Sequence, residues 1–388
     1  MDLELWHLFL LPVLFAAGWV SRGVEKRQNE AEGKETPEAY AQGVTLLLAG
    51  KADKAIDCFI EAVRLEPDRT DLHFILGRLF RERGEYSRAI RVHESLVNSA
   101  ELPMEERVEA LRELAEDFMT AGLFDRAEEA YKMLADTPDA HLDALRALLR
   151  IYIIEHEWVA AIDTARALET QAEEDRSQEI SHYYLELADT SLRNKRLDFA
   201  EECVTEALKT VAKSPRGWIT RGTIALAKGD AEAAKAAWRH LLEIAPEYVP
   251  LVVGKLADAM IASGEKEAAL DFLVKTGHDP AATDAVDEIL ARIGKIAGEE
   301  EALRFAESIL KEHPTLATYS AYLKCSTAGA TPSEDMTKML SGMMQRYSRR
   351  FSRYQCAKCG FLASSFAWGC LGCGAWDSFP PRKNGDAL

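Results

Sequence analysis

The feature that most constrains this chain is a repeat with a period of 34 residues. A small residue recurs at intervals of 34, 38, 34, 39, 34, 34 and 34, each time near the expected start of a helix: Ala55, Ala89, Ala127, Ala161, Ala200, Ala234, Ala268 and Ala302. A unit of this length holds two helices and a turn, and it buries its apolar face only by stacking on its neighbours. The sequence therefore predicts an all-α superhelical solenoid.

Other positions keep the same register and identify the repeat type. Glycines lie twelve residues before the alanine (Gly43, Gly77, Gly222), aromatic residues four after it (Phe59, Tyr131, Trp238) and prolines twelve after it (Pro67, Pro246, Pro314). The glycine permits close helix contact, the aromatic ring fills the space between helices, and the proline ends the second helix. This pattern predicts tetratricopeptide repeats over residues 37–345: eight repeats, a degenerate ninth ending near Arg346, and insertions in the inter-repeat loops near residues 100–107 and 171–179.

The charge and the missing motifs indicate a binding protein. The net charge is -17, which argues against general nucleic-acid binding. We find no local signature of a catalytic nucleophile, a phosphate-binding loop or a zinc protease. We therefore expect no enzyme and no nucleic-acid partner. The sequence leaves the oligomeric state open, with a homo-oligomer among the alternatives.

Arginines gather on one predicted face of the second, third and fourth repeats. On the helical register, five of them face the concave groove: Arg78, Arg81, Arg112, Arg146 and Arg150. One interpretation is a groove that grips an acidic partner segment through guanidinium forks. The other is that neighbouring Asp and Glu residues neutralise these arginines.

Four of the seven cysteines lie within residues 356–373: Cys356, Cys359, Cys370 and Cys373. Two C-x-x-C pairs bring four thiolates to one tetrahedral centre, and a glycine after each pair allows the tight turn that such a site needs. Zinc is the default metal, and iron fits the same four sulfurs. The alternatives are two disulfides, four ordinary buried thiols and, because both pairs resemble the knuckles of rubredoxin, a redox centre.

The metal-binding domain is predicted over residues 346–388. Its small apolar core is expected to come from Phe361, Phe366, Trp368 and Trp376. A basic run with aromatic residues leads into the cysteines and includes Arg346, Arg349, Arg350, Arg353 and Lys358. We expect this run to dock onto the acidic helical body, and RNA binding is the alternative.

The N-terminus predicts a membrane anchor over residues 1–20, followed by a polar tether over residues 21–36. Residues 3–20 are almost wholly apolar and span about 27 Å as a helix. Acidic residues precede this run and basic residues follow it, which is the reverse of a signal peptide. The positive-inside rule then predicts a single-pass protein with its N-terminus outside and its body in the cytoplasm. The alternative is an N-terminal helix buried in the globular body.

This order of parts resembles the lipopolysaccharide assembly protein B family along the whole chain. The segments that carry the resemblance are "LLPVLFAAGW", "LGRLFRERGEYSRAIRVHESL" and "RYQCAKCGF". The resemblance implies a bacterial inner-membrane protein that restrains lipopolysaccharide biosynthesis by presenting the deacetylase LpxC to the protease FtsH, under an inner-membrane regulator that senses lipopolysaccharide. It also implies that the four knuckle cysteines bind the metal.

Three functional hypotheses follow from the sequence. The first is the membrane-tethered adaptor that delivers an enzyme to a protease. The second is a scaffold that coordinates lipopolysaccharide synthesis enzymes and transport without promoting proteolysis. The third is a redox or RNA-binding ribbon protein.

Overall fold

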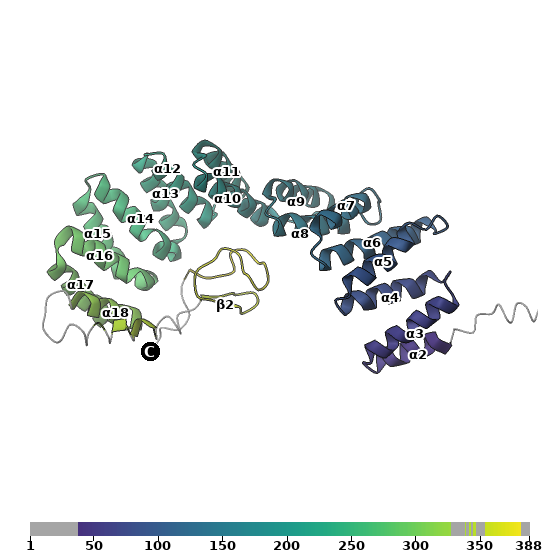
Figure 1. Ribbon diagram of the computed structural model, residues 1–388. Helices are drawn as coiled ribbons and strands as arrows, with labels where there is room; N and C mark the ends of the chain where they lie inside the picture. Colours follow the sequence, from purple (N-terminus) through teal and green to yellow (C-terminus); the bar gives the residue numbers. More distant parts are fainter. Residues whose placement is uncertain (1–37, 327–337, 339–340, 343, 347–353, 382–388) are drawn as a thin grey trace, which may run out of the picture. The chain divides into compact units, whose positions relative to one another are not determined.

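A computed structural model describes residues 38–326, 338, 341–342, 344–346 and 354–381 of the chain (Figure 1). The predicted anchor and tether, over residues 1–36, lie outside this part. Within it, no helix is both long enough and apolar enough to cross a bilayer. The chain divides into two compact units, Met1–Ile151 and Tyr152–Leu388.

The first unit consists of antiparallel helix pairs in the predicted order. Its helices are α2 (Glu38–Leu48), α3 (Ala52–Leu65), α4 (Thr70–Glu82), α5 (Tyr86–Val97), α6 (Met104–Thr120), α7 (Phe124–Ala135) and the greater part of α8 (His141–Ile154). In each pair the even-numbered helix is the first helix of a repeat and the odd-numbered helix is the second.

The second unit continues the pairs and ends in a small β-structure. Its helices are α9 (Trp158–Ala172), α10 (Ser177–Arg193), α11 (Leu197–Thr210), α12 (Pro215–Ala227), α13 (Ala231–Ile244), η1 (Pro246–Tyr248), α14 (Val249–Ala262), α15 (Lys266–Gly277), η2 (Pro280–Ala285), α16 (Val286–Ala297), α17 (Glu299–Glu312) and α18 (Leu316–Ser326). Strands β1 (Tyr354–Gln355) and β2 (Leu362–Ala363) pair antiparallel, Tyr354 opposite Ala363. We call residues 354–381 the ribbon.

The repeat register holds, with one correction. The fourth residue of every second helix from α3 to α17 is a buried alanine. In α15 this residue is Ala269, whereas Ala268, which the sequence predicts, is exposed. A shift of one residue turns a helical side chain by about 100°, so only one of two adjacent alanines can face the core. The even spacing of 34 residues was therefore wrong at this repeat.

The extra residues of the two longer intervals, of 38 and 39 residues, lie in other places than the sequence predicts. The extra residues mostly lengthen the first helices: α6 and α10 have 17 residues each, whereas α4 and α12 have 13 each. The inter-repeat loops before α6 and α10 stay short, at residues 98–103 and 173–176. A longer helix satisfies its own backbone hydrogen bonds, which a longer loop would not.

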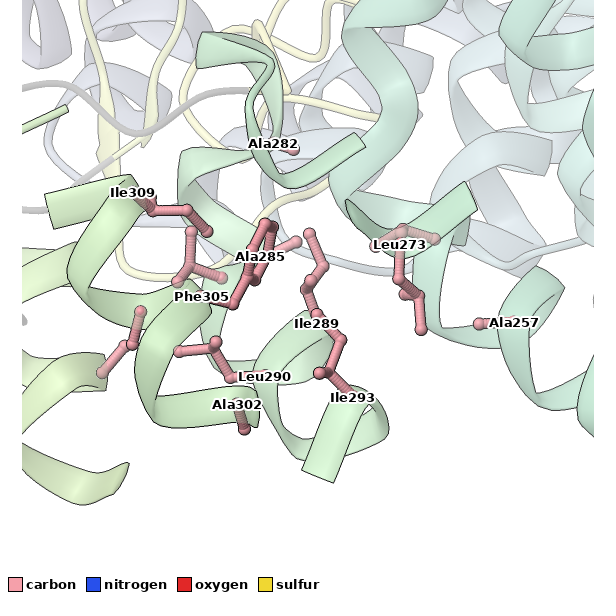
Figure 2. Close-up of a cluster of buried hydrophobic side chains, with 14 of the residues drawn as sticks. Ala257, Leu273, Ala282, Ala285, Ile289, Leu290, Ile293, Ala302, Phe305 and Ile309 are labelled. Carbon is pink, nitrogen blue, oxygen red and sulfur yellow. The ribbon is translucent and has the colours of Figure 1, made fainter. Parts of the chain in front are cut away.

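The core of each unit consists of several clusters of buried side chains, with small residues where helices approach. Figure 2 shows the part formed by α14 to α17, where Ile289 and Ile293 of α16 pack toward Phe305 of α17 and Leu273 of α15. Ala282 and Ala285 of η2 also belong to this cluster and are buried. The small side chains in η2 allow this short helix to lie close to its neighbours.

The predicted partnership of glycine and aromatic residue is confirmed. A Cβ atom on Gly222 would lie 2.4 Å from Nε1 of Trp238, and one on Gly77 would lie 2.3 Å from Nε2 of His93, which occupies the aromatic position of its repeat. Both rings are buried. Glycine is therefore required here by close approach and not by backbone conformation.

Gly222→Ala is expected to destabilise the second unit by about 1–3 kcal/mol, because the added methyl group overlaps a buried indole. Gly294→Ala is the matched control. A Cβ there would meet only the Cβ of Ala302, at 3.7 Å, so alanine should be neutral or stabilise by up to about 1 kcal/mol. Thermal unfolding of the two variants tests this. Equal destabilisation by both would contradict the close-approach explanation.

Candidate metal centre and the helical face beneath it

The four knuckle cysteines lie together at one end of the ribbon. Their Sγ atoms are all within 4.8 Å of one another. The Cys356–Cys373 and Cys359–Cys370 sulfur distances are 3.8 and 3.6 Å. A tetrahedral ion with metal–sulfur bonds of about 2.3 Å has sulfur–sulfur edges of about 3.8 Å, whereas a disulfide bond is about 2.0 Å long. The arrangement fits a single metal ion and not two disulfides.

The two knuckles are built alike. Gly360 and Gly374 have φ angles of 76° and 69°, in the left-handed region that favours glycine. Their amides donate to the carbonyl oxygens of Cys356 and Cys370, at 2.9 and 2.8 Å. The amide of Gly372 points at Sγ of Cys370, at 3.3 Å. Both glycines therefore allow the tight turns that the sequence predicts, and the amide of Gly372 favours the thiolate form that a metal requires.

The pKa values of Cys356 and Cys359 are both shifted by the neighbouring groups of the cluster. A hydrogen bond from Ser378, with those from the amides of Cys359 and Lys358, lowers the pKa of Cys356 to about 6. For Cys359, a backbone hydrogen bond from Phe361 acts to lower the pKa. Desolvation and hydrogen bonds to the other three sulfurs act in the opposite direction, and together they raise the pKa of Cys359 to about 12. Four adjacent thiolates need a positive ion between them, and zinc or iron would supply it.

The core of the ribbon differs from the prediction. Tyr354 and Phe379 are buried with Cys356 and Cys370, and of the four predicted aromatic residues only Phe366 packs against them. Phe361 is 39% exposed. Trp368 and Trp376 contact helices of the second unit instead. The prediction was wrong because it assigned all four aromatic side chains to the ribbon's own core, whereas both tryptophans lie in an interface with the helices.

The centre of this interface is Trp376. Its ring stacks on the ring of His182 from α10, with centroids 4.5 Å apart and 11° between the planes, and it meets Tyr183 edge-on at 6.3 Å. The adjacent Asp377 accepts hydrogen bonds through Oδ2 from the amide of Gln178 and from Nε2 of His182, the latter at 2.8 Å. One helix thus receives an aromatic ring and a carboxylate side by side.

A buried arginine supports this contact from α12. Arg216 is 4% exposed, and its Nη2 donates to Glu186 at 2.9 Å and to Asp189 at 2.6 Å, both on α10. Its Nη1 lies 3.5 Å from Nδ1 of His182. Arginine cannot accept a hydrogen bond, so this arrangement fits a neutral His182 that carries its proton on Nε2, facing Asp377.

A second aromatic contact lies further along the array. The ring of Trp368 stacks on Tyr248 of η1, with centroids 5.7 Å apart and planes at 12°. Phe366 and Trp368 also pack against the buried cluster that contains Trp238 and Val252. Burial, with the charge of Asp377 as a smaller cause, raises the pKa of Tyr248 to about 12, so the tyrosine stays neutral at physiological pH.

The docking of the basic run onto the helical body stays a prediction. Arg349, Arg350 and Arg353 lie outside the described residues, and Arg346 and Lys358 are exposed. Aromatic stacking and one aspartate carry the observed contact. Neither His182 nor Arg216 was predicted; the only signal for them was the tryptophan–aspartate pair that begins three residues after the last cysteine.

The five predicted groove arginines lie in the first unit, and four of them make ion pairs with neighbouring acids. Arg78 pairs with Glu109 and Glu113, Arg81 with Glu113 and Asp117, Arg112 with Glu109, and Arg146 with Asp143. Arg150 is exposed on α8. These pairs support the interpretation that acidic neighbours neutralise the arginines.

The most buried of these pairs form a network between repeats. Asp117 has no exposed side-chain surface, and it lies between Arg81, at 2.7 Å, and Nδ1 of His93, at 2.6 Å. Burial opposes ionisation of Glu113, but hydrogen bonds from Arg78 and Arg81 lower its pKa from the ordinary 4.5. The stability gained from Glu113 is complete above that value and is lost as the pH falls through the lowered pKa.

Arg81→Ala is expected to lower the free energy of local unfolding of α4 and α6 by about 3 kcal/mol, because it removes the guanidinium shared by two buried carboxylates and leaves Glu113 with only the half-exposed Arg78 and Asp117 with only His93. Arg112→Ala is the control, since its single ion pair is exposed and should cost less than about 1 kcal/mol. Native-state hydrogen exchange of the α4–α6 amides measures both values. Similar losses in the two variants would mean that burial of the network contributes little.

Comparison with known proteins agrees with both parts of this architecture. A family model described as "Rubredoxin metal binding domain" matches residues 354–381, and tetratricopeptide-repeat models match residues 40–99 and 215–248. Among solved structures, the TPR2AB-domain:pHSP90-complex of yeast Sti1 is similar at 18% identity and a TM-score of 0.34, covering 74% of this chain and 97% of that chain. The family-model matches and the helix pairs described above show a tetratricopeptide-repeat solenoid with a C-terminal ribbon.

Two curated proteins match along essentially their whole length. "Lipopolysaccharide assembly protein B" from Escherichia coli (strain K12) is 32% identical over 100% of both chains. The protein of the same name from Haemophilus influenzae (strain ATCC 51907 / DSM 11121 / KW20 / Rd) is 26% identical over 97% of both chains. The repeats, the ribbon and this full-length identity show that the chain belongs to the lipopolysaccharide assembly protein B family.

Proposed function

We propose that the chain is an inner-membrane-anchored adaptor that regulates lipopolysaccharide biosynthesis by presenting the deacetylase LpxC to the protease FtsH. The observation that carries the proposal is the full-length 32% identity to a protein named for lipopolysaccharide assembly. An array of helix pairs joined to a small metal-binding domain offers large protein-binding surfaces. In this account a lipopolysaccharide-sensing inner-membrane regulator controls the adaptor.

We further propose a separate role for each part of the chain. Residues 1–20 anchor it in the inner membrane, with the N-terminus in the periplasm, and residues 21–36 tether the cytoplasmic body. Residues 37–345 bind protein partners, and residues 346–388 bind one zinc or iron through Cys356, Cys359, Cys370 and Cys373. The sulfur geometry supports the metal assignment, and the resemblance supports the anchor.

The arginine surface of the first unit stays a proposed partner site. The side chains of Arg78, Arg112 and Arg146 are between 42% and 47% exposed, so the carboxylates of an acidic partner segment can reach them. Arg112→Glu combined with Arg146→Glu should weaken partner binding by about 2 kcal/mol or more. Wild-type binding should also weaken with added salt. Unchanged affinity in a folded variant would place the partner on another surface.

A crosslinked pull-down from membranes tests the proposed function. The chain is captured after crosslinking in cells, and the bound proteins are identified. The proposal expects LpxC and FtsH to be enriched together over a control membrane protein. Recovery of other lipopolysaccharide enzymes without the protease would contradict the adaptor mechanism and favour a scaffold.

A further inference from the structure

We propose that the face of α10 and α12 beneath the ribbon is a binding site for a protein segment that carries an aromatic residue followed by a carboxylate. In this structure the chain's own Trp376 and Asp377 occupy the site as a tethered ligand. A partner that presents the same chemistry competes with the ribbon for it. The inference goes beyond the proposed function, because it names a site and a partner chemistry whichever proteins the adaptor serves.

Contacts within the helices fix the side chains of this site. With the ribbon in place, His182 is 1% exposed and Arg216 is 4% exposed, and polar side chains so deeply buried need specific partners. Arg216 is fixed by Glu186 and Asp189 and in turn faces His182. The imidazole thus has a fixed orientation, in which one nitrogen meets the incoming carboxylate and one ring face meets the incoming indole.

The occupying segment turns its side chains toward the helices, while its backbone belongs to the ribbon: Trp376 bridges to Gly369, and the amide of Asp377 donates to the carbonyl oxygen of Trp368 at 2.8 Å. The buried core of the ribbon consists of Tyr354, Cys356, Cys370 and Phe379, without Trp376 or Asp377. Asp377 has a φ of 48°, a left-handed conformation that is strained for a non-glycine residue. The contacts with Gln178 and His182 offset this cost.

The tethered ligand also fits imperfectly, which leaves room for a competitor. Among the residues that the structure describes, no donor reaches the buried Oδ1 of Asp377, and a buried acceptor without a donor weakens binding. Attachment to the same chain compensates, because a short tether gives an effective concentration of the order of millimolar. In a better-fitting partner segment, both carboxylate oxygens would accept hydrogen bonds. Such a segment would bind the helical face more tightly than the ribbon does through the same contacts, and would displace the ribbon.

The test uses the full-length, metal-loaded chain and a fluorescent peptide with the sequence of residues 374–380, GAWDSFP. In wild type the ribbon blocks the site. In the double variant Trp376→Ala with Asp377→Lys, the ribbon loses its ring and its charge and leaves the site. The peptide should bind this released variant about tenfold or more tightly than wild type. If the ribbon unfolds in the variant, the site is equally vacated, so the measurement still reports on the helices.

Two controls identify the chemistry. A peptide with lysine in place of aspartate should lose binding to the released variant, and Arg216→Glu added to that variant should abolish binding of GAWDSFP. Asp377→Asn alone keeps the shape of the loop and should give intermediate peptide affinity. The proposal is overturned if the released variant binds GAWDSFP no better than wild type does, or binds the lysine peptide equally well. Either outcome leaves the proposed function untouched, since no client protein enters the assay.

Discussion

Cys356→Ser is expected to reduce the metal content from about one ion per chain to almost none and to unfold the ribbon. A small domain whose core holds few aromatic side chains depends on its metal for folding, and structural zinc contributes about 10–16 kcal/mol in comparable sites. Removal of one of four thiolates removes a bond that nothing nearby replaces. Cys373→Ser should act in the same way, because its sulfur lies 3.8 Å from that of Cys356.

The helical body should survive this change. The ribbon contains only two strands of two residues each, so the far-ultraviolet circular dichroism should keep its helical form. The fluorescence of Trp368 and Trp376 should shift to the red as both rings leave Tyr248 and His182. Cys58→Ser is the matched control: this half-buried thiol of α3 lies outside the cluster and should leave the metal in place. Metal retained by both knuckle variants would refute the four-cysteine site.

Deletion of residues 1–20 is expected to abolish function in cells while leaving a folded protein that still binds its client. When an adaptor and a protease are held on the same membrane, their effective concentration toward each other rises without any new contact between them. The deleted chain loses that gain. The measurement is the lifetime of LpxC in cells that carry the truncated chain at normal abundance.

An unrelated membrane helix of the same orientation separates tethering from recognition. If it restores the short lifetime of LpxC, residues 3–20 act only as a tether. If it fails although the protein is abundant and membrane-bound, the anchor itself recognises a membrane partner. Full activity of the soluble truncation would contradict the membrane-adaptor mechanism.

The fold could be predicted because its determinants are local. Each alanine such as Ala234 is buried at the fourth position of a second helix, and the glycine twelve residues earlier meets the aromatic ring four residues later. A periodic pattern of this kind can still be wrong by one residue, as at Ala268, where the buried alanine is Ala269. The C-x-x-C pairs are equally local, since each knuckle closes within five residues.

The interface could not be predicted because its partners are remote in sequence. Asp377 and His182 are 195 residues apart, and no spacing rule connects them. The arginines show the same limit: Arg81 finds its carboxylates 32 and 36 residues away on the next repeat. A helical register shows which face a side chain occupies but not which charge lies opposite.

The half-life of LpxC after depletion of this chain tests the central claim most directly. The measurement follows LpxC after protein synthesis is stopped, in cells with and without the chain and in cells that lack FtsH activity. The adaptor account predicts a several-fold longer half-life on depletion, with no further effect when FtsH is inactive. An unchanged half-life in depleted cells with impaired lipopolysaccharide assembly would contradict it and establish a scaffold that does not promote proteolysis.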